Sequence, residues 1–243
     1  MGRPAKTTDS DVLDTTYLLA WQRGCDAITI RDLEVALDLR APSIYRRFHS
    51  RDALLAAAID RYVDREVDGR VRHYLEDSSD ALQGIRQFFL RTLDLMAELQ
   101  TPPGCLVATT SQQSSYAVPV IREAVDRGTA RVREALLAAL ERATAQGHRF
   151  TVPHDDLAWA LLQNYVGVVM LTRCGQTRLQ PSMTIVLDAL LGVVPDGITP
   201  AGFNARSGGG GSAIVHTADA AQPVGSEASW SGISFPGTSS EAH

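Results

Sequence analysis

Residues 29–51 read TIRDLEVALDLRAPSIYRRFHSR, and this stretch predicts two short helices joined by a three-residue turn. Thr29 is expected as the N-cap of the first helix, with Asp32 at its third position, where a carboxylate interacts well with the free N–H groups of the first turn. Asp38 tolerates a left-handed backbone and ends this helix after two turns. Pro42 lies in the first turn of the second helix, which suits its fixed φ angle. Two helices this short need a third one to bury their apolar faces.

A third helix is expected just before this pair. Apolar positions recur at helical spacing between Val12 and Ala20, and Gly24 follows where a helix ends in a left-handed residue. The lengths of the two later helices and of their turn are those of a helix-turn-helix, whose second helix enters the major groove of DNA. The sequence therefore predicts a three-helix DNA-binding domain in residues 1–50.

The charge of this stretch differs from that of the whole chain. The 243 residues carry a net charge of −5 and only 6% aromatic residues, which excludes a uniformly basic protein and argues against a surface for stacking single-stranded bases. Between Leu39 and Arg51, however, four arginines and one histidine occur without an acidic residue. A solvated basic face would explain the charge alone, but with the short helices and their turn it predicts a surface for DNA phosphates.

Residues 3–65 resemble the DNA-binding domain of the TetR family of transcriptional regulators. The matching segments are the arm Gly2–Pro4, VLDTTYLLAWQRG at 12–24, TIRDL at 29–33, PSIYRRF at 42–48 and SRDALL at 50–55. Three residues depart from the family pattern: Asp38 replaces a common glycine, Arg40 a Ser or Thr cap, and Arg47 a frequent histidine. We therefore expect a less well capped start of the second helix, and the change at Arg47 leaves the operator sequence open but not the binding of DNA.

Ten residues are expected to contact DNA. Arg46 can pair in a bidentate manner with guanine, a contact that discriminates between bases by about 1–3 kcal/mol. The candidates for base edges are Ala41, Pro42, Ser43 and Arg46, those for phosphates are Thr29, Tyr45, Arg47 and Arg51, and those for a minor groove are Arg3 and Lys6 on the N-terminal arm. Tyr45 also reads as a packing residue and Ser43 as plain surface.

The chain after residue 50 is expected to be helical, so the fold class is all-α with about nine helices. The predicted helices cover 51–74, 80–100, 104–113, 118–145, 155–174 and 181–193, and no stretch alternates like a strand. The resemblance implies that residues 51–198 form a ligand-binding and dimerisation domain. The last two helices are apolar on more than one face, which independently predicts a homodimer through them. Two recognition helices would then lie about 34–36 Å apart on a palindromic operator.

The resemblance also implies a small-molecule effector. The segment TPPGCL at 101–106 is similar to a Pro-Gly-Cys-Leu stretch that precedes a short helix beside the pocket in one branch of the family. Such pockets combine apolar side chains with a few polar groups, and the candidates are Phe88, Met96, Cys105, Tyr116, Trp159, Gln163 and Tyr165. Each of them also reads as an ordinary core residue.

No metal site or cofactor is predicted. Residues His154–Asp156 could bind a metal, but three adjacent residues at a helix start are typical of capping. The three cysteines are scattered and indicate free thiols. From residue 199 to 243 the chain is rich in Gly, Ser and Ala and is expected to be disordered. Its GGGGS run at 208–212 matches an engineered flexible linker, so the sequence does not decide whether the tail is natural or engineered.

The expected protein is a cytoplasmic, homodimeric repressor that a small molecule releases from its operator. A polar N-terminus and apolar stretches too short for a bilayer favour the cytoplasm. An enzyme is disfavoured because no Gly-rich phosphate loop opens a helix and neither GxSxG nor HExxH occurs. The alternatives are an activator of the same family, and a ligand-binding or scaffold protein whose helix-turn-helix does not bind DNA.

Overall fold

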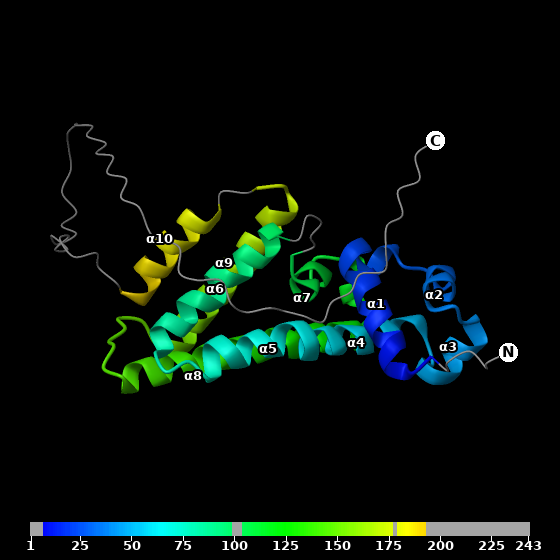
Figure 1. Ribbon diagram of the computed structural model, residues 1–243, viewed down its shortest axis with the longest axis horizontal. Coiled ribbons are helices and arrows are strands. Elements are labelled where there is room, and N and C mark those ends of the chain that lie inside the picture. The colour runs from blue at the N-terminus through cyan, green and yellow to red at the C-terminus, as the bar shows by residue number, and fades with distance from the viewer. Residues whose placement is uncertain (1–6, 99–103, 177–178, 193–243) are drawn as a thin grey trace. The chain divides into compact units, whose positions relative to one another are not determined.

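The computed structural model describes residues 7–98, 104–176 and 179–192, and these ranges are helical, as predicted (Figure 1). If the helical run 51–76 is counted once, they form nine α-helical stretches and no strand. The first three are α1 (Asp9–Arg23), α2 (Ile30–Leu37) and α3 (Ala41–Phe48). Their core consists of fully buried side chains from all three helices and from the helix that follows, namely Val12, Leu33, Ile44, Leu54 and Leu55.

Local sequence signals determine where these helices begin and end. The N-cap of α1 is Thr8, whose side chain accepts a hydrogen bond from the N–H of Asp11. Gly24 ends α1 with a φ of 84°, a conformation that favours glycine. Ser50 is the N-cap of α4, and its side chain accepts a hydrogen bond from the N–H of Ala53 at 3.0 Å.

The helix that follows Ser50 runs further than the sequence predicts, and it is not a regular α-helix. It consists of α4 (Arg51–Tyr62), a π-helical turn at Val63–Val67, α5 (Asp68–Arg70) and a second π-helical turn at Val71–Glu76. A π turn holds more residues than an α turn and so rotates the side chains that follow it. The buried side chains of this segment beyond residue 63 are Val67, Arg70, Val71 and Leu75.

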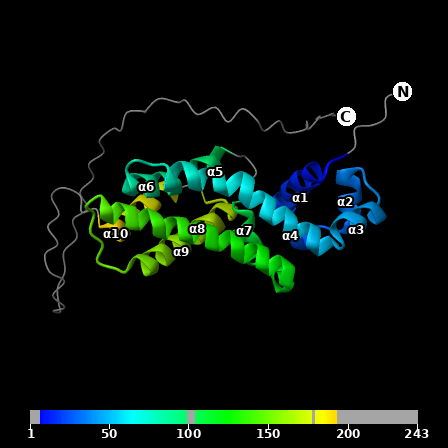
Figure 2. The same cartoon turned by 90° about the horizontal axis from the view of Figure 1, so that it is seen from below.

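The remaining helices are α6 (Ala81–Glu98), α7 (Leu106–Thr110), α8 (Pro119–Ala145), α9 (His154–Arg173) and α10 (Leu179–Leu191). α8 lies along α4 and also packs against α6 and α9, while α10 packs against α6 and α9 (Figures 1 and 2). The helix predicted over 104–113 is shorter than expected, since α7 begins at Leu106 and ends at Thr110, and a separate 3₁₀ turn follows at residues 114–117. α7 thus lies between the long helices and the N-terminal three.

The described residues belong to one compact unit. The domain boundary expected at residue 50 stays a prediction, and the tail expected to be disordered lies outside the described residues. Of the helices within the described ranges, none is both long and apolar enough to cross a membrane.

Candidate DNA-binding surface

The start of α2 is fixed by a reciprocal pair of hydrogen bonds. The hydroxyl of Thr29 accepts from the N–H of Asp32 at 3.2 Å, and the Asp32 carboxylate accepts from the N–H of Thr29 at 2.8 Å. Hydrogen bonds from Thr29, supported by an ion pair with Arg23 at 3.1 Å, lower the pKa of Asp32 to about 2. The predicted phosphate contact Thr29 is therefore exposed at the surface and held in a capping box.

The turn between α2 and α3 contains two of the departures from the family pattern. Asp38 adopts the left-handed conformation, with φ 50° and ψ 41°, as expected for the residue that replaces a glycine. Within the described residues, Arg40 makes no side-chain capping hydrogen bond. The carboxylate of Glu34 on α2 instead accepts from the N–H of Ala41 at 2.6 Å. As expected, the N-cap residue of α3 provides no side-chain cap, and Glu34 of α2 instead supplies an acceptor for the first N–H group of α3.

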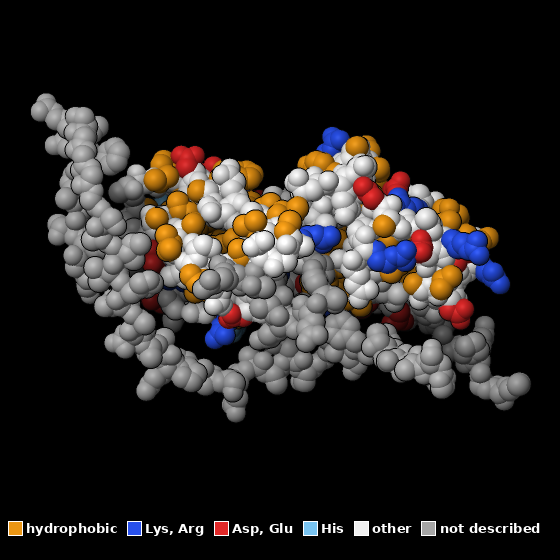
Figure 3. All heavy atoms as spheres, turned by 90° about the horizontal axis from the view of Figure 1, so that it is seen from above, with side chains coloured by type: hydrophobic (Ala, Val, Ile, Leu, Met, Phe, Trp, Pro, Cys, Tyr) orange, Lys and Arg blue, Asp and Glu red, His pale blue; other side chains and the backbone are white. Residues whose placement is uncertain are grey.

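α3 has one buried face and one exposed face. Ile44 is fully buried, whereas Pro42, Tyr45 and Arg46 are exposed. Ser43 is partly exposed, and its Oγ lies 3.5 Å from Nη2 of Arg46. In Figure 3, Lys and Arg side chains lie at the surface of the end that carries α2 and α3. The candidates for base contact therefore share an accessible helix face.

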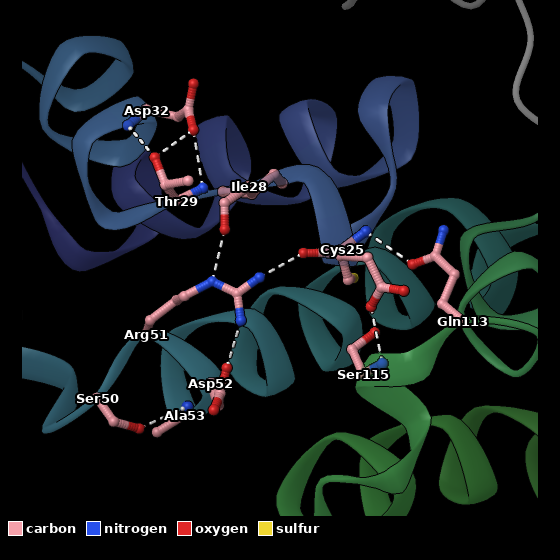
Figure 4. A network of polar contacts seen from close by, with 11 residues as sticks. Cys25, Ile28, Thr29, Asp32, Ser50, Arg51, Asp52, Ala53, Gln113 and Ser115 are labelled. Atoms are coloured by element: carbon pink, nitrogen blue, oxygen red, sulfur yellow. Dashed lines mark hydrogen bonds and ion pairs between the residues drawn. The ribbon is translucent and has the colours of Figure 1, made fainter.

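Two of the arginines predicted to contact phosphates are held within the fold. Arg47 donates to the carbonyl of Thr7 at 3.1 Å and forms an ion pair with Asp9 at 3.5 Å. Arg51 donates from Nε to the carbonyl of Ile28 at 2.5 Å and from Nη2 to the carbonyl of Cys25 at 2.6 Å (Figure 4).

The third bond of Arg51 runs from Nη1 to the carboxylate of Asp52 at 2.6 Å. Three of its five N–H groups are thus occupied. Arg51 therefore connects the residues between α1 and α2 (24–29, the α1–α2 segment) to the start of α4. The remaining two predicted residues, Arg3 and Lys6, lie outside the described residues.

Hydrogen bonds also join the α1–α2 segment to the chain around α7. The N–H of Cys25 donates to Oε1 of Gln113 at 2.8 Å, and the Asp26 carboxylate accepts from the N–H groups of Ser114 and Ser115 at 2.8 and 2.7 Å (Figure 4). Nε1 of Trp21 donates to the carbonyl of Gly104 at 2.8 Å. Sequence reasoning missed this junction, because its partners are more than 80 residues apart.

The structure brings together only some of the predicted ligand-binding residues. Phe88, Cys105 and Tyr165 are buried, and the rings of Phe88 and Tyr165 lie 6.2 Å apart. Trp159 is 43% exposed, and Gln163 is exposed on the same helix.

The other two candidates lie elsewhere. The Tyr116 hydroxyl donates to Asp126 at 2.9 Å in an exposed position, and the side chain of Met96 lies outside the described residues. Sequence reasoning missed three buried polar side chains near Tyr165, namely Tyr62, Arg70 and Thr92. Over the described part of the chain, no group of three or more His, Cys, Asp or Glu side chains could hold a metal ion.

The three N-terminal helices, with α3 capped by α2 and exposed along one face, define a helix-turn-helix protein. A family model described as "Bacterial regulatory proteins, tetR family" matches residues 12–58. A second model, "Tetracyclin repressor-like, C-terminal domain", matches residues 81–181, so that the two models together cover more than half of the chain. The chain belongs to the TetR family of bacterial regulatory proteins.

Relatives and solved structures agree with this assignment. The HTH-type transcriptional repressor ComR of Escherichia coli (strain K12) is 30% identical over 107 residues, which are 44% of this chain and 50% of that protein. The chain thus matches about half of the length of this relative. A crystal structure of a TetR transcriptional regulator from Chloroflexus aurantiacus J-10-FL is 26% identical, with a TM-score of 0.63 over 76% of this chain and 92% of that one.

A cysteine mutant of the TetR family regulator CifR, complexed with 26-bp double-strand operator DNA, has the same fold. Its TM-score is 0.67 at 19% identity, and the match covers 80% of this chain and 100% of that one.

Proposed function

We propose that this protein is a homodimeric repressor that binds a palindromic operator through α3 and is released when a small molecule binds among its C-terminal helices. The observation that carries this proposal is the exposed, arginine-bearing face of α3, which is capped from α2 and lies in a stretch without acidic residues. TetR-family regulators bind operator DNA, as in the complex of the CifR mutant with its double-strand operator.

The exposure of each side chain supports a division of roles on DNA. Ala41, Pro42, Ser43 and Arg46 on the outer face of α3 would contact base edges, and Arg46 would bind a guanine. Thr29, Tyr45 and Arg47 would contact phosphates, while Arg3 and Lys6 on the arm would reach a minor groove. We assign Arg51 mainly to positioning α4 against the α1–α2 segment, because its guanidinium already binds two backbone carbonyls.

Exposed apolar side chains on the last two helices support a homodimer. Trp159 and Leu171 on α9 are 43% and 47% exposed, and Ile185 on α10 is 68% exposed. Figure 3 shows apolar side chains gathered over the part of the surface that holds these helices. Burying this surface against a second copy would remove it from water and place two α3 helices on one operator.

The junction around α7 supports release by a ligand. A ligand that contacts Cys105 or α7 would act on a segment that is hydrogen-bonded to the α1–α2 segment through Gly104, Gln113 and Ser115. A shift of this segment would change the spacing of the recognition helices in the dimer, so ligand and operator would favour different arrangements. In this proposal the protein acts in the cytoplasm and has no catalytic role.

Selection of bound sequences from random double-stranded DNA, followed by gel-shift titration, tests the proposal. We expect a palindromic site, a salt-sensitive affinity and a mass of two chains per complex. Arg46→Ala should weaken binding about 5- to 150-fold and relax preference at one base pair. Arg91→Ala on α6, remote from α3, is the matched control and should bind like the parent.

The outcomes separate the alternatives. A protein that selects no sequence at low salt would be a ligand-binding or scaffold protein whose helix-turn-helix does not bind DNA, and the proposal would fail. Transcription in vitro from a promoter that contains the selected site should fall when protein is added. A rise would identify an activator instead.

A further inference from the structure

The C-terminal helices contain a buried cation without a carboxylate partner. Arg70 on α5 is only 9% exposed. Its Nε donates to the carbonyl of Glu66 at 2.8 Å, and its Nη1 donates to the hydroxyl of Thr92 at 2.9 Å. Among the residues that the structure describes, no carboxylate forms an ion pair with this guanidinium. Burial of an unpaired charge is unfavourable, so its persistence calls for a functional explanation.

The side chains around Arg70 are polar, buried and uncharged. Tyr165, Tyr62 and Cys105 lie close enough to interact with the guanidinium, and Tyr165 is hydrogen-bonded to it. Burial is the main cause that raises the pKa values of both tyrosine hydroxyls, so they stay protonated and can donate hydrogen bonds. A fixed positive charge beside neutral donors is an environment that attracts an anion.

The chemistry of the cluster indicates which anion fits. A single guanidinium balances the single charge of a carboxylate and matches its two oxygens with parallel N–H groups. The rings of Phe88 and Phe89 lie 6.2 and 6.1 Å from that of Tyr165 and provide apolar surroundings. A phosphate would bring a larger charge than one arginine balances.

We propose that the effector is a small organic carboxylate with an apolar body, whose carboxylate pairs with Arg70 and accepts hydrogen bonds from the hydroxyls of Tyr62 and Tyr165. The inference rests on the proposed release by a small molecule, and it names the chemical class of that molecule.

The same cluster touches the DNA-binding helices. The ring of Tyr62 contacts that of Trp21 on α1 at 5.2 Å, and Trp21 also donates to the carbonyl of Gly104, the neighbour of Cys105. A ligand that displaces Tyr62 or Cys105 therefore acts on the position of α1. This contact explains how a small anion near Arg70 would change the affinity of α3 for DNA.

Calorimetric titration of the full chain without DNA tests the carboxylate site. The probes are benzoate, phenylacetate and hexanoate, each compared with its uncharged amide. At least one carboxylate should bind and raise the Tm with increasing concentration, while its amide should bind at least 10-fold more weakly. Arg70→Met should weaken carboxylate binding at least about 30-fold. It should leave the Tm without ligand unchanged or higher, since an apolar side chain replaces an unpaired charge.

Two further variants keep the test decisive. Arg91→Met on α6 is the matched control and should bind the carboxylate like the parent. If Arg70→Met does not fold, Arg70→Lys decides, because it keeps the charge without the planar fork and should bind at least 10-fold more weakly. Equal binding of acids and amides, or carboxylate binding that Arg70 variants leave unchanged, would overturn the proposal. A carboxylate that binds at Arg70 but leaves the affinity for the operator unchanged would refute release of the protein from DNA by this ligand, while it would support the carboxylate site itself.

Discussion

Replacing Arg51 by methionine removes three hydrogen bonds that hold the α1–α2 segment against α4. Two of them reach the backbone carbonyls of Ile28 and Cys25, at 2.5 and 2.6 Å, and the third reaches the Asp52 carboxylate. Methionine keeps most of the length of the side chain, so the loss concerns hydrogen bonds more than packing. The carbonyl of Cys25 retains a second donor, the N–H of Ile28 at 3.3 Å, whereas that of Ile28 accepts from no other described residue.

The expected size of the effect follows from these contacts. A hydrogen bond to a charged group contributes about 1.5–3 kcal/mol, while the bond between Arg51 and Asp52 is partly exposed and adds about 0–1 kcal/mol. The Arg51 side chain is 27% exposed, so water can replace part of what is lost. We expect the free energy of unfolding to fall by about 2–4 kcal/mol, which corresponds to a Tm lower by about 5–15 °C in a domain of this size.

Urea unfolding followed by circular dichroism at 222 nm measures this difference, and two variants complete the experiment. Arg51→Lys keeps the charge but cannot reach both carbonyls in a fork, so it should recover less than half of the loss. Arg46→Met removes an exposed arginine from the same basic stretch and should leave stability within about 0.5 kcal/mol of the parent while weakening operator binding.

Equal stability of Arg51→Met and Arg46→Met would show that Arg51 does not position α4. The same conclusion follows if Arg51→Met binds DNA more weakly without any loss of stability, since Arg51 would then act as a phosphate contact rather than as a positioning residue.

Two more predictions concern the helix caps. Hydrogen bonds from Thr29 lower the pKa of Asp32 from 3.8 to about 2, so the ionised cap stabilises the fold above about pH 4 and its contribution disappears as the pH falls through 2. The acid-unfolding curve of Asp32→Asn should therefore approach that of the parent near pH 2. A difference in stability between the two proteins that does not change with pH would contradict this. Glu34→Ala should weaken operator binding about 2- to 30-fold, because the N–H of Ala41 loses its acceptor. Glu34→Gln keeps an acceptor without the charge and should bind more tightly than Glu34→Ala in the same gel-shift titration; equal binding by the two would exclude a capping role.

Caps and turns were predictable because they depend on residues close in sequence. Thr29, Asp38, Pro42 and Ser50 occupy the positions that their side-chain or backbone preferences indicate. The cap that Glu34 provides to α3 was not predictable in this way, because it requires the turn to bring α2 against the start of α3. The roles of Arg46 and Arg51 could not be distinguished from the sequence for the same reason. Arg46 is exposed and Arg51 is hydrogen-bonded within the protein, and this difference depends on what the fold places beside each of them.

Helix geometry could have refined the ligand-binding candidates on α9. Trp159 and Gln163 are four residues apart and share one face, whereas Leu161 and Tyr165 form a second pair offset from the first by two residues, which is about 200° around the helix. The two pairs therefore lie on opposite faces, and one pair alone can point inward. The structure buries Leu161 and Tyr165 and exposes Trp159 and Gln163.

The burial of Arg70 could not be predicted from the sequence. Arg70 follows Val67 by three residues and so shares its face of a helix, but an arginine is assigned to the surface by residue type, since arginine is rarely buried without a partner. In the structure Arg70 is buried, with Thr92 of α6 and Tyr165 of α9 beside it. The cause is non-local, because these neighbours come from distant parts of the chain. An unpaired buried charge is found only once these helices are assembled, and this is why Arg70, on which the proposed carboxylate site depends, is absent from the ligand-binding residues that the sequence suggests.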